Sequence, residues 1–307
     1  MHTITNTNHT KRMKTISILN YKGGAGKTTT TANLGTALWI LGYKVLLIDS
    51  DIQGNLTFLM GFDQSCGDPT LHDWMLHDGN PPIYERYPGL YYIPVSGDQE
   101  FEQKLDKMYH REDVLRDHLE PIRQMFDYIL IDCSFKAGLT NTNALNASDS
   151  LLIPSECASF SMQGMEKLMD TYEDIRRRMN RRLEIEGVLL TKYQERTKFS
   201  RKMTEWLEGD ERYAGRIFNT RIRKCIRFDE SPLENKSVFE RDVLCNGSED
   251  YLRLAEEITG TTRPDEWQYI PLNAWQQEHP DDEGVNGQLE TLPTSLKGRS
   301  KNLITNH

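Results

Sequence analysis

Six short runs of apolar, β-branched and aromatic residues recur along this chain, and helical patterns lie between most of them. The runs cover residues 15–19, 44–48, 91–95, 128–131, 150–153 and 187–190. The helical segments, several with apolar residues at three- and four-residue spacing, cover residues 28–41, 101–108, 114–125, 162–179 and 249–258. Strands that alternate with helices pair side by side, so the sequence predicts an α/β fold, a mainly parallel twisted sheet with helices on both faces.

The length of 307 residues is enough for one sizeable α/β core with tails. We expect a disordered N-terminal extension over residues 1–13 and one folded domain over residues 14–262. After Gly260 the composition shifts to Pro, Asp, Glu, Asn and Gly without sustained periodicity. Residues 263–307 are therefore predicted to form an acidic, mostly disordered tail.

Charge and cysteine content narrow the class of protein. The formal net charge is −9, from 37 basic and 46 acidic residues, which gives no global sign of binding to nucleic acid or an acidic membrane. The five cysteines are odd in number and form no Cys-x-x-Cys pair, so we expect a reducing compartment and interpret them as small buried hydrophobic residues. No run reaches eighteen apolar residues and residues 1–14 are polar, so we predict a cytoplasmic protein without a membrane span or secretory signal.

A glycine-rich stretch, Asn-Tyr-Lys-Gly-Gly-Ala-Gly-Lys-Thr-Thr at residues 20–29, joins the first apolar run to the first helical segment. Glycines let the backbone curl so that several N–H groups point at one phosphate, and the helix N-terminus adds partial positive charge. Lys27 would reach the β- and γ-phosphates of a nucleotide, and the Thr28 hydroxyl would be a magnesium ligand. A glycine-rich turn with incidental lysines is the alternative, but the strand before it and the helix after it favour a phosphate site. The candidate nucleotide-binding residues are Lys22, Gly23, Gly24, Ala25, Gly26, Lys27, Thr28 and Thr29.

Two acidic motifs follow later apolar runs. Asp49 and Asp51 come directly after the second run, in Asp-Ser-Asp-Ile-Gln-Gly-Asn, and Asp132 ends the fourth, in Phe-Asp-Tyr-Ile-Leu-Ile-Asp-Cys. An acid at the end of such a strand can hold magnesium through water. Taken alone, each aspartate is equally well explained as a helix cap or a turn former. Their order along the chain, after the phosphate loop, favours a metal site.

The phosphate loop departs from the ordinary Gly-x-x-x-x-Gly-Lys-Ser/Thr pattern, because Tyr21 stands where the first glycine belongs and Lys22 is an additional lysine. The run Lys-Gly-Gly-x-Gly-Lys-Thr-Thr is the deviant Walker A motif. Together with the two acidic motifs, it makes residues 14–262 resemble the Soj-like branch of the ParA family, among the ParA/MinD P-loop ATPases. The resemblance implies the P-loop NTPase fold, ATP and Mg²⁺ as cofactors, and slow, partner-stimulated hydrolysis of ATP to ADP and phosphate.

The resemblance also implies roles for individual residues. Two subunits would form a homodimer around two ATP molecules, with Lys22 reaching across to the partner's phosphates and Lys27 binding those of its own subunit. Asp51 would position the attacking water. Asp49 and Asp132 would lie near magnesium.

The chain departs from the resembled family at two places. Relatives have Pro-Pro soon after the acid that ends the fourth run, whereas this chain has Cys133-Ser134-Phe135-Lys136. Ile52 replaces a usual proline in the other acidic motif. Proline would restrict φ and stiffen these loops, so we expect their switching to differ here.

Basic residues concentrate between Arg176 and Arg227, where sixteen Lys and Arg stand against seven Asp and Glu. This stretch carries +9 and the remainder of the chain −18. A solvated helix face would explain part of the pattern. The resemblance instead implies binding of double-stranded DNA, without sequence preference, in the ATP state. The candidate DNA-binding residues are Arg196, Lys198, Arg201, Arg221, Arg223 and Arg227.

The function that the resemblance implies is an ATP-dependent dimerising switch that partitions or positions plasmid or chromosomal DNA with a ParB-like adaptor. It would associate with the nucleoid in its ATP state and have no membrane partner. The residues before the first strand are too few for a helix-turn-helix domain, so operator binding is not expected. The alternative is a MinD-like or cargo-positioning ATPase that acts on a protein assembly or a membrane, although residues 295–307 lack the amphipathic basic helix of a membrane-bound relative.

Overall fold

The computed structural model describes residues 13–157, 162–263 and 287–288. Within this part of the chain the strands form one eight-stranded sheet in the order β7-β6-β1-β5-β2-β4-β3-β8. The strands are β1 (Lys14–Ile18), β2 (Val45–Asp49), β3 (Tyr84–Tyr87), β4 (Leu90–Ile93), β5 (Tyr128–Asp132), β6 (Ser150–Glu156), β7 (Glu184–Thr191) and β8 (Gly287–Gln288). Neighbouring strands from β7 to β4 are parallel, while β3 pairs antiparallel with β4 and β8. The predicted mainly parallel α/β sheet is therefore confirmed.

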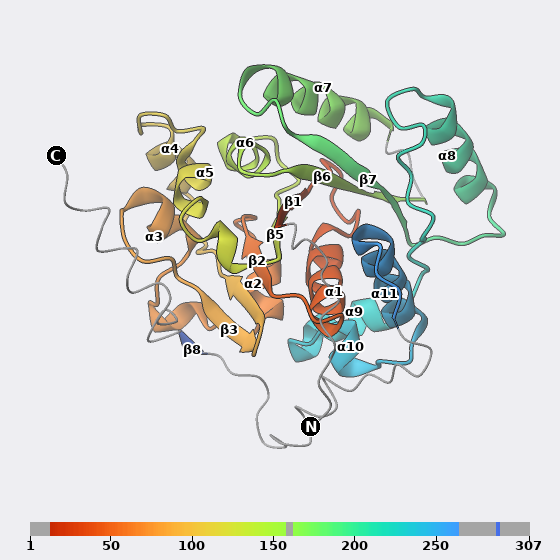
Figure 1. The fold of residues 1–307 in the computed structure, drawn as a ribbon, viewed down its shortest axis with the longest axis horizontal. Coiled ribbons are helices and arrows are strands. Elements are labelled where there is room, and N and C mark those ends of the chain that lie inside the picture. Colours follow the sequence, from red (N-terminus) through yellow and green to blue (C-terminus); the bar gives the residue numbers. More distant parts are fainter. Residues whose placement is uncertain (1–12, 158–161, 264–286, 289–307) are drawn as a thin grey trace.

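Helices cover both faces of this sheet (Figure 1). One face buries side chains of α3 to α8, and the other buries side chains of α1, α2, α10 and α11. The helices are α1 (Lys27–Ile40), α2 (Asn55–Leu59), α3 (Leu71–Leu76), α4 (Phe101–Leu105), α5 (Val114–Leu119), α6 (Leu139–Asn146), α7 (Met162–Arg178), α8 (Lys198–Gly209), α9 (Arg227–Glu230), α10 (Val238–Arg241) and α11 (Asn246–Thr259). Short 3₁₀ turns lie at η1 (Gln64–Cys66), η2 (Arg123–Met125) and η3 (Ser231–Glu234).

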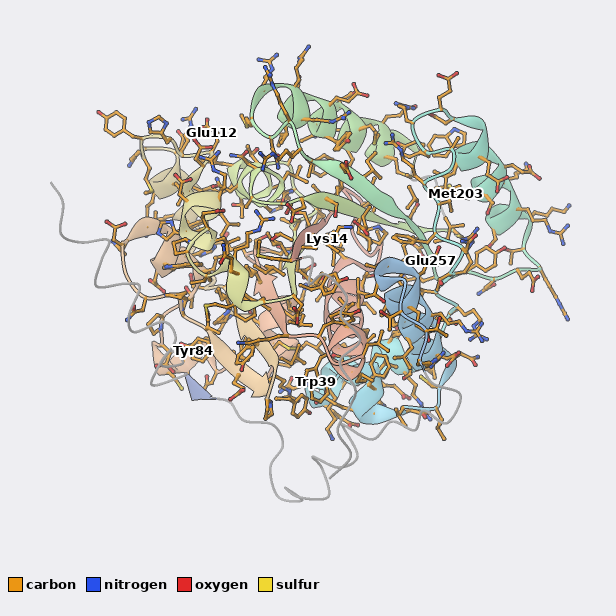
Figure 2. The ribbon with its side chains drawn as sticks, viewed as in Figure 1. Lys14, Trp39, Tyr84, Glu112, Met203 and Glu257 are labelled. Atoms are coloured by element: carbon orange, nitrogen blue, oxygen red, sulfur yellow. The ribbon has the colours of Figure 1, made fainter. Side chains whose placement is uncertain are left out.

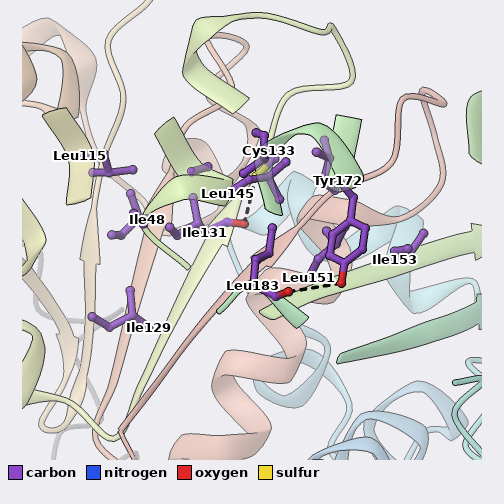
Figure 3. Packing of buried hydrophobic residues seen from close by; sticks show 14 of the residues in the cluster. Ile48, Leu115, Ile129, Ile131, Cys133, Leu145, Leu151, Ile153, Tyr172 and Leu183 are labelled. Atoms are coloured by element: carbon purple, nitrogen blue, oxygen red, sulfur yellow. Dashed lines mark hydrogen bonds between the residues drawn. The ribbon is translucent and has the colours of Figure 1, made fainter. Parts of the chain in front are cut away.

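The strand β2 is apolar on both faces up to its last residue, Asp49, because helices cover both faces of the sheet. In β2, Val45 and Leu47 pack with α1 and α11, whereas Leu46 and Ile48 pack in the cluster on the opposite face. Figure 3 shows Ile48 and Ile131 of β5 in the cluster on the face that α3 to α8 cover. Successive strand residues point to opposite faces, so a strand buried on both sides needs an unbroken apolar run. That is the pattern from which the parallel sheet was predicted.

All six predicted strands are present, with ends displaced by a few residues. Two predicted helices are shorter than expected. The helix predicted over 114–125 ends at Leu119, because Pro121 has no N–H with which to continue it, and η2 follows. The helix predicted over 101–108 ends at Leu105. The strand β3 and the helices α2, α3, α9 and α10 were not predicted, since elements of four to six residues carry little periodicity. The longer helix α8 was not predicted either.

The predicted N-terminal extension and acidic tail lie outside the described residues, apart from Met13, Arg263 and β8. In β8, Gln288 is the register partner of Tyr84 in β3, which Figure 2 labels beside it. Residues 287–288 thus add an edge strand to the sheet. No helix in the described part of the chain is long and apolar enough to cross a membrane.

Candidate functional site

The phosphate loop connects β1 to α1 at the carboxyl end of the central strands. Gly24 (φ 75°) and Gly26 (φ 91°) adopt the left-handed conformation that glycine takes without steric cost. The Thr191 hydroxyl, at the end of β7, donates a hydrogen bond to the Ala25 carbonyl at 2.9 Å. A Cβ on Gly26 would lie 3.6 Å from Thr191 Cγ2, so β7 closes one side of the loop. The first N–H groups of α1 have no partner within the helix and offer positive charge to a phosphate.

Lys27, the first residue of α1, is buried, with 8% of its surface exposed. Burial lowers the pKa of its ammonium group, and the nearby carboxylates of Asp132 and Asp51 oppose this shift. The Lys27 Nζ lies 5.7 Å from the centroid of the Phe135 ring. The adjacent Thr28 donates its hydroxyl to Asp132 Oδ2 at 2.6 Å. A cation and a hydroxyl are therefore held beside carboxylates at the base of the loop.

Asp49 and Asp132 end the neighbouring strands β2 and β5, where they are register partners, and both are buried. Asp49 Oδ2 accepts the N–H and the hydroxyl of Thr57, each at 2.7 Å, and Asp49 Oδ1 accepts the Asp51 N–H at 3.1 Å. Burial raises the pKa of Asp49 to about 7, and burial together with the Asp49 charge raises the pKa of Asp132 well above its ordinary value. A cation bound here would offset the repulsion between these carboxylates.

The donors at this site fit Mg²⁺. They are the Thr28 hydroxyl and the carboxylates of Asp49, Asp51 and Asp132, and hard divalent cations prefer oxygen ligands. Within the described residues, no group of three or more His, Cys, Asp or Glu side chains forms a metal site by itself. Mg²⁺ usually keeps several waters and takes phosphate oxygens as further ligands. A Mg²⁺ site that is complete only with a nucleotide therefore agrees with the oxygen donors found here and with the lack of a purely protein-built metal site in the described residues.

Lys22 points away from the loop that follows it. Its Nζ lies 2.9 Å from Glu156 Oε2 at the end of β6, and the Lys192 Nζ lies 3.3 Å from the other Glu156 oxygen. The Lys22 N–H donates to Asn20 Oδ1 at 2.9 Å, and the Asn20 amide donates to the Pro154 carbonyl at 2.7 Å. The start of the phosphate loop is thus tied to β6 of the same subunit.

Sequence reasoning missed Glu156 and the loop contact of Thr191. Glu156 is 134 positions from Lys22, and Thr191 is 166 positions from Ala25. No spacing along the chain signals either contact, because both depend on the order in which β1, β6 and β7 lie in the sheet.

The loop after β5 is braced without the prolines of the resembled family. The Asn141 amide group donates to the carbonyls of Ser134 at 2.9 Å and Lys136 at 2.8 Å. Asn141 Oδ1 accepts the Ser134 N–H at 3.1 Å. Three hydrogen bonds from one buried side chain therefore hold the backbone that carries Phe135. Nothing in the structure explains the other departure, Ile52.

The second candidate site is a basic groove of about 920 Å³ beside the end of β7. Five basic and two acidic side chains line it. The basic ones are Arg196, Arg221, Arg223, Lys224 and Arg253. Hydrogen bonds from the Tyr193 N–H to the Ile222 carbonyl and from the Lys224 N–H to the Tyr193 carbonyl join the two predicted basic segments. Glu257 of α11, labelled in Figure 2, supports the groove by accepting the N–H groups of Asn219 and Thr220.

The six predicted DNA-binding residues fall into different environments. Arg196, Arg221 and Arg223 line the basic groove, whereas Lys198 and Arg201 are exposed on α8. The Arg223 guanidinium pairs at 2.7 Å with the buried carboxylate of Asp250. Ion pairs of this kind reduce the charge that remains for a ligand.

Arg227 is the most heavily paired of the six. Its guanidinium contacts Glu230 at 2.7 Å and Asp242 at 3.2 Å. The structure therefore makes Arg196 and Arg221 the candidates best placed to contact an anion.

These features define a class of protein. A parallel strand, a glycine-rich loop with a buried lysine, a helix, and an acid at the end of the adjacent strand together make up the nucleotide site of a P-loop NTPase. A family model described as an AAA domain matches residues 13–185.

Known proteins place the chain more closely. It is 36% identical to the chromosome partitioning protein ParA of Caulobacter vibrioides, in an alignment that covers 82% of this chain and 96% of the relative. It is 35% identical to the sporulation initiation inhibitor protein Soj of Bacillus subtilis, in an alignment that covers 80% of this chain and 98% of that relative. A structure described as cobyrinic acid a,c-diamide synthase of Mycobacterium smegmatis, with bound ATP analogue and magnesium, has a TM-score of 0.70 at 27% identity, and covers 82% of this chain and 98% of that chain. The chain belongs to the ParA/MinD family of P-loop ATPases, and its cofactors are ATP and Mg²⁺.

Proposed function

We propose that this protein is an ATP-dependent dimerising switch that binds double-stranded DNA without sequence preference in its ATP state and partitions plasmid or chromosomal DNA with a ParB-like adaptor. Membership of the ParA/MinD family supports ATP hydrolysis in general. The observation that carries the DNA part of the proposal is the basic groove, whose lining begins at Tyr193, two residues after the β7 residue Thr191 that contacts the phosphate loop.

In the nucleotide site, Lys27 would bind the β- and γ-phosphates, and the loop N–H groups would bind other phosphate oxygens. Thr28, Asp49 and Asp132 would hold Mg²⁺, which would neutralise phosphate charge. Asp51, which is nearly buried and lies two residues beyond Asp49, positions the water that attacks the γ-phosphate.

Dimerisation brings Lys22 into the partner's site. In one subunit Lys22 is engaged by its own Glu156, so it must exchange this partner for phosphate oxygens across the interface. A lysine that arrives only in the dimer supplies positive charge where negative charge develops during phosphoryl transfer. Hydrolysis is thereby coupled to assembly and is slow in the isolated subunit. An adaptor that favours the assembled state would accelerate it.

The DNA surface follows from the groove. Arg196 and Arg221 come from separate segments that the hydrogen bonds around Tyr193 hold side by side. Positive side chains in one groove displace condensed counterions from a duplex without reading its sequence. Two grooves in one ATP dimer would contact the duplex together, so affinity should rise steeply on assembly.

The test measures binding to two unrelated duplexes at several salt concentrations, with ATP or ADP. The variant Arg196→Glu with Arg221→Glu reverses two groove charges. The matched control, Arg181→Glu with Arg182→Glu, reverses two exposed charges in the same basic stretch but outside the groove. We expect ATP-dependent binding that is equal for both duplexes and falls with salt. The groove variant should lose at least about tenfold in affinity and have a flatter salt slope, while the control keeps most of its binding.

Equal losses in both double variants would contradict the groove as the DNA site. Absence of DNA binding by the unmodified protein in ATP, with hydrolysis intact, would instead support the alternative of a positioning ATPase that acts on a protein assembly or membrane. Hydrolysis rates measured with DNA and with centromere-binding proteins then test the ParB-like partner.

A further inference from the structure

Two cysteines that are far apart in the sequence meet at the wall of the basic groove. The Sγ atoms of Cys225 and Cys245 lie 3.9 Å apart. Lys224 precedes Cys225 and Asn246 follows Cys245, and both of these neighbours line the groove. We call Cys225 and Cys245 the thiol pair. It joins the segment before α9 to the N-terminal end of α11.

The other three cysteines have no such arrangement. Cys133 and Cys157 are buried, as predicted from the sequence, and Cys66 is exposed. The prediction that all five are buried hydrophobic residues is therefore wrong for Cys66 and for the half-buried thiol pair. These three thiols lie in or beside loops and short helical turns at the surface, which a cysteine count does not show.

Contacts on both sides hold the thiol pair in register. The Arg223 N–H and guanidinium both bind the Asp250 carboxylate, at 2.9 Å and 2.7 Å. On the other side the Phe228 ring packs against Gly247, where a Cβ would come within 2.6 Å of the ring. A disulfide requires its sulfurs to be about 2 Å apart. Because contacts on both sides clamp the two segments together, closure of the disulfide requires the two sulfurs to approach from 3.9 Å to about 2 Å.

Small molecules in solution can reach the pair. The residues beside it, Ile226 and Leu244, are 67% and 79% exposed, so the chain turns toward solvent at both cysteines. Burial raises the pKa of the Cys225 thiol, which lowers its thiolate fraction and slows its reaction with oxidants. The pair is half-buried, so we expect its oxidation to be slow and to need an excess of oxidant.

We propose that the thiol pair is a reversible redox site that closes to an intramolecular disulfide when a hydroperoxide oxidises it. One thiolate attacks a peroxide oxygen, the O–O bond breaks, and a sulfenic acid and water form. The second thiolate attacks the sulfenic sulfur, so an S–S bond forms, the S–O bond breaks, and the leaving hydroxide becomes water. With hydrogen peroxide, two electrons pass from the thiols to the oxidant and two waters result. A dithiol reductant reverses the reaction by thiol–disulfide exchange.

The disulfide would cross-link the ends of the segment that contains α9, η3 and α10. It would also fix the groove wall between Lys224 and Asn246. The redox site does not depend on DNA binding, because its geometry rests only on the contacts of this subunit.

The experiment treats the reduced full-length chain with excess hydrogen peroxide, blocks the remaining thiols with N-ethylmaleimide, and maps the peptides by mass spectrometry. We expect peptides carrying Cys225 and Cys245 to be joined by a disulfide, lighter by two hydrogens than the sum of the two free peptides, and dithiothreitol to separate them again. The variants Cys225→Ser and Cys245→Ser should each abolish the joined peptides. The control Cys66→Ser removes the exposed thiol outside the pair and should leave them unchanged.

Recovery of Cys225 and Cys245 on separate peptides, whether labelled or oxidised further to sulfinic acid, would overturn the proposal. So would a cross-link that joins Cys66 to either residue or joins two chains. These readings come from the unmodified protein, so they do not depend on how well the serine variants fold. ATP binding by the oxidised protein confirms that the disulfide formed in the folded state.

Discussion

At the residue scale, Lys27 has the least replaceable position in the nucleotide site. Its ammonium group is buried at the start of α1, next to two carboxylates. We predict that Lys27→Ala lowers ATP affinity by about 100-fold or more, because charge-assisted hydrogen bonds to phosphate are among the strongest polar contacts. Equilibrium nucleotide binding measures this. Lys22→Ala is the matched control, since Lys22 faces Glu156 and should retain nucleotide binding.

Phe135 lies in the loop where the resembled family has Pro-Pro. The Lys27 ammonium lies over its ring, 5.7 Å from the ring centroid, so the ring competes with phosphate for this cation if the contact persists when nucleotide binds. A cation–π contact is worth about 0.5–1 kcal/mol at a partly exposed site. We predict that Phe135→Ala raises ATP affinity about threefold, measured by titration with a fluorescent ATP analogue. Phe135→Leu keeps the apolar bulk without the aromatic face and should share the gain; unchanged or weaker affinity in both would show that the ring does not compete with nucleotide.

At the element scale, the join between α3 and α4 depends on a buried histidine. The His72 ring stacks on Phe101, with centroids 3.7 Å apart, and its Nδ1 lies 2.8 Å from the Ser96 hydroxyl. Burial lowers the pKa of His72 to about 4, although the Asp98 and Asp73 charges oppose the shift. Below about pH 6.5 the unfolded chain therefore binds a proton at this residue that the folded chain does not.

Because the pKa of His72 is lowered in the folded state, acid favours the unfolded chain. The contribution of the neutral His72 ring to the free energy of unfolding is fully present above pH 6.5 and is lost as the pH falls toward 4. Between pH 7 and pH 5 the loss amounts to about 2 kcal/mol. We predict that His72→Phe, which keeps the stacked ring, loses about 2 kcal/mol less than the unmodified protein over that range in urea unfolding. The exposed His77→Gln is the control and should follow the unmodified protein.

At the scale of the whole molecule, the proposed switch depends on a second subunit. Lys22→Ala should bind nucleotide normally but lose ATPase activity and dimerise less, because the phosphate that it contacts belongs to the partner. Asp51→Ala should give the opposite result, an ATP dimer that persists because the water is no longer positioned. Light scattering with ATP and a phosphate-release assay distinguish the two. Hydrolysis at the unmodified rate by a Lys22→Ala protein that binds ATP would falsify the role across the interface.

Much of the fold and the phosphate loop could be predicted because their signals are local. The glycines, Lys27 and Thr28 are consecutive, and the conformation of a strand–loop–helix unit depends on backbone freedom and helix-terminal charge within ten residues. Apolar runs also predicted the central strands, because a strand covered on both faces carries mostly apolar residues. The strand β3 was not predicted, because it is only four residues long and contains two charged residues among its tyrosines. It lies near the edge of the sheet, where only the two-residue strand β8 lies beyond it.

The sequence by itself determined which residues could bind phosphate, which acids end strands, and where positive charge concentrates. Only the tertiary structure decided that Asp49 lies opposite Asp132, that Glu156 holds Lys22, and that Cys225 meets Cys245. Each of these contacts joins residues from different elements. Their distance is set by strand order and helix packing, which depend on how the whole core is buried and leave no spacing in the chain from which to predict them.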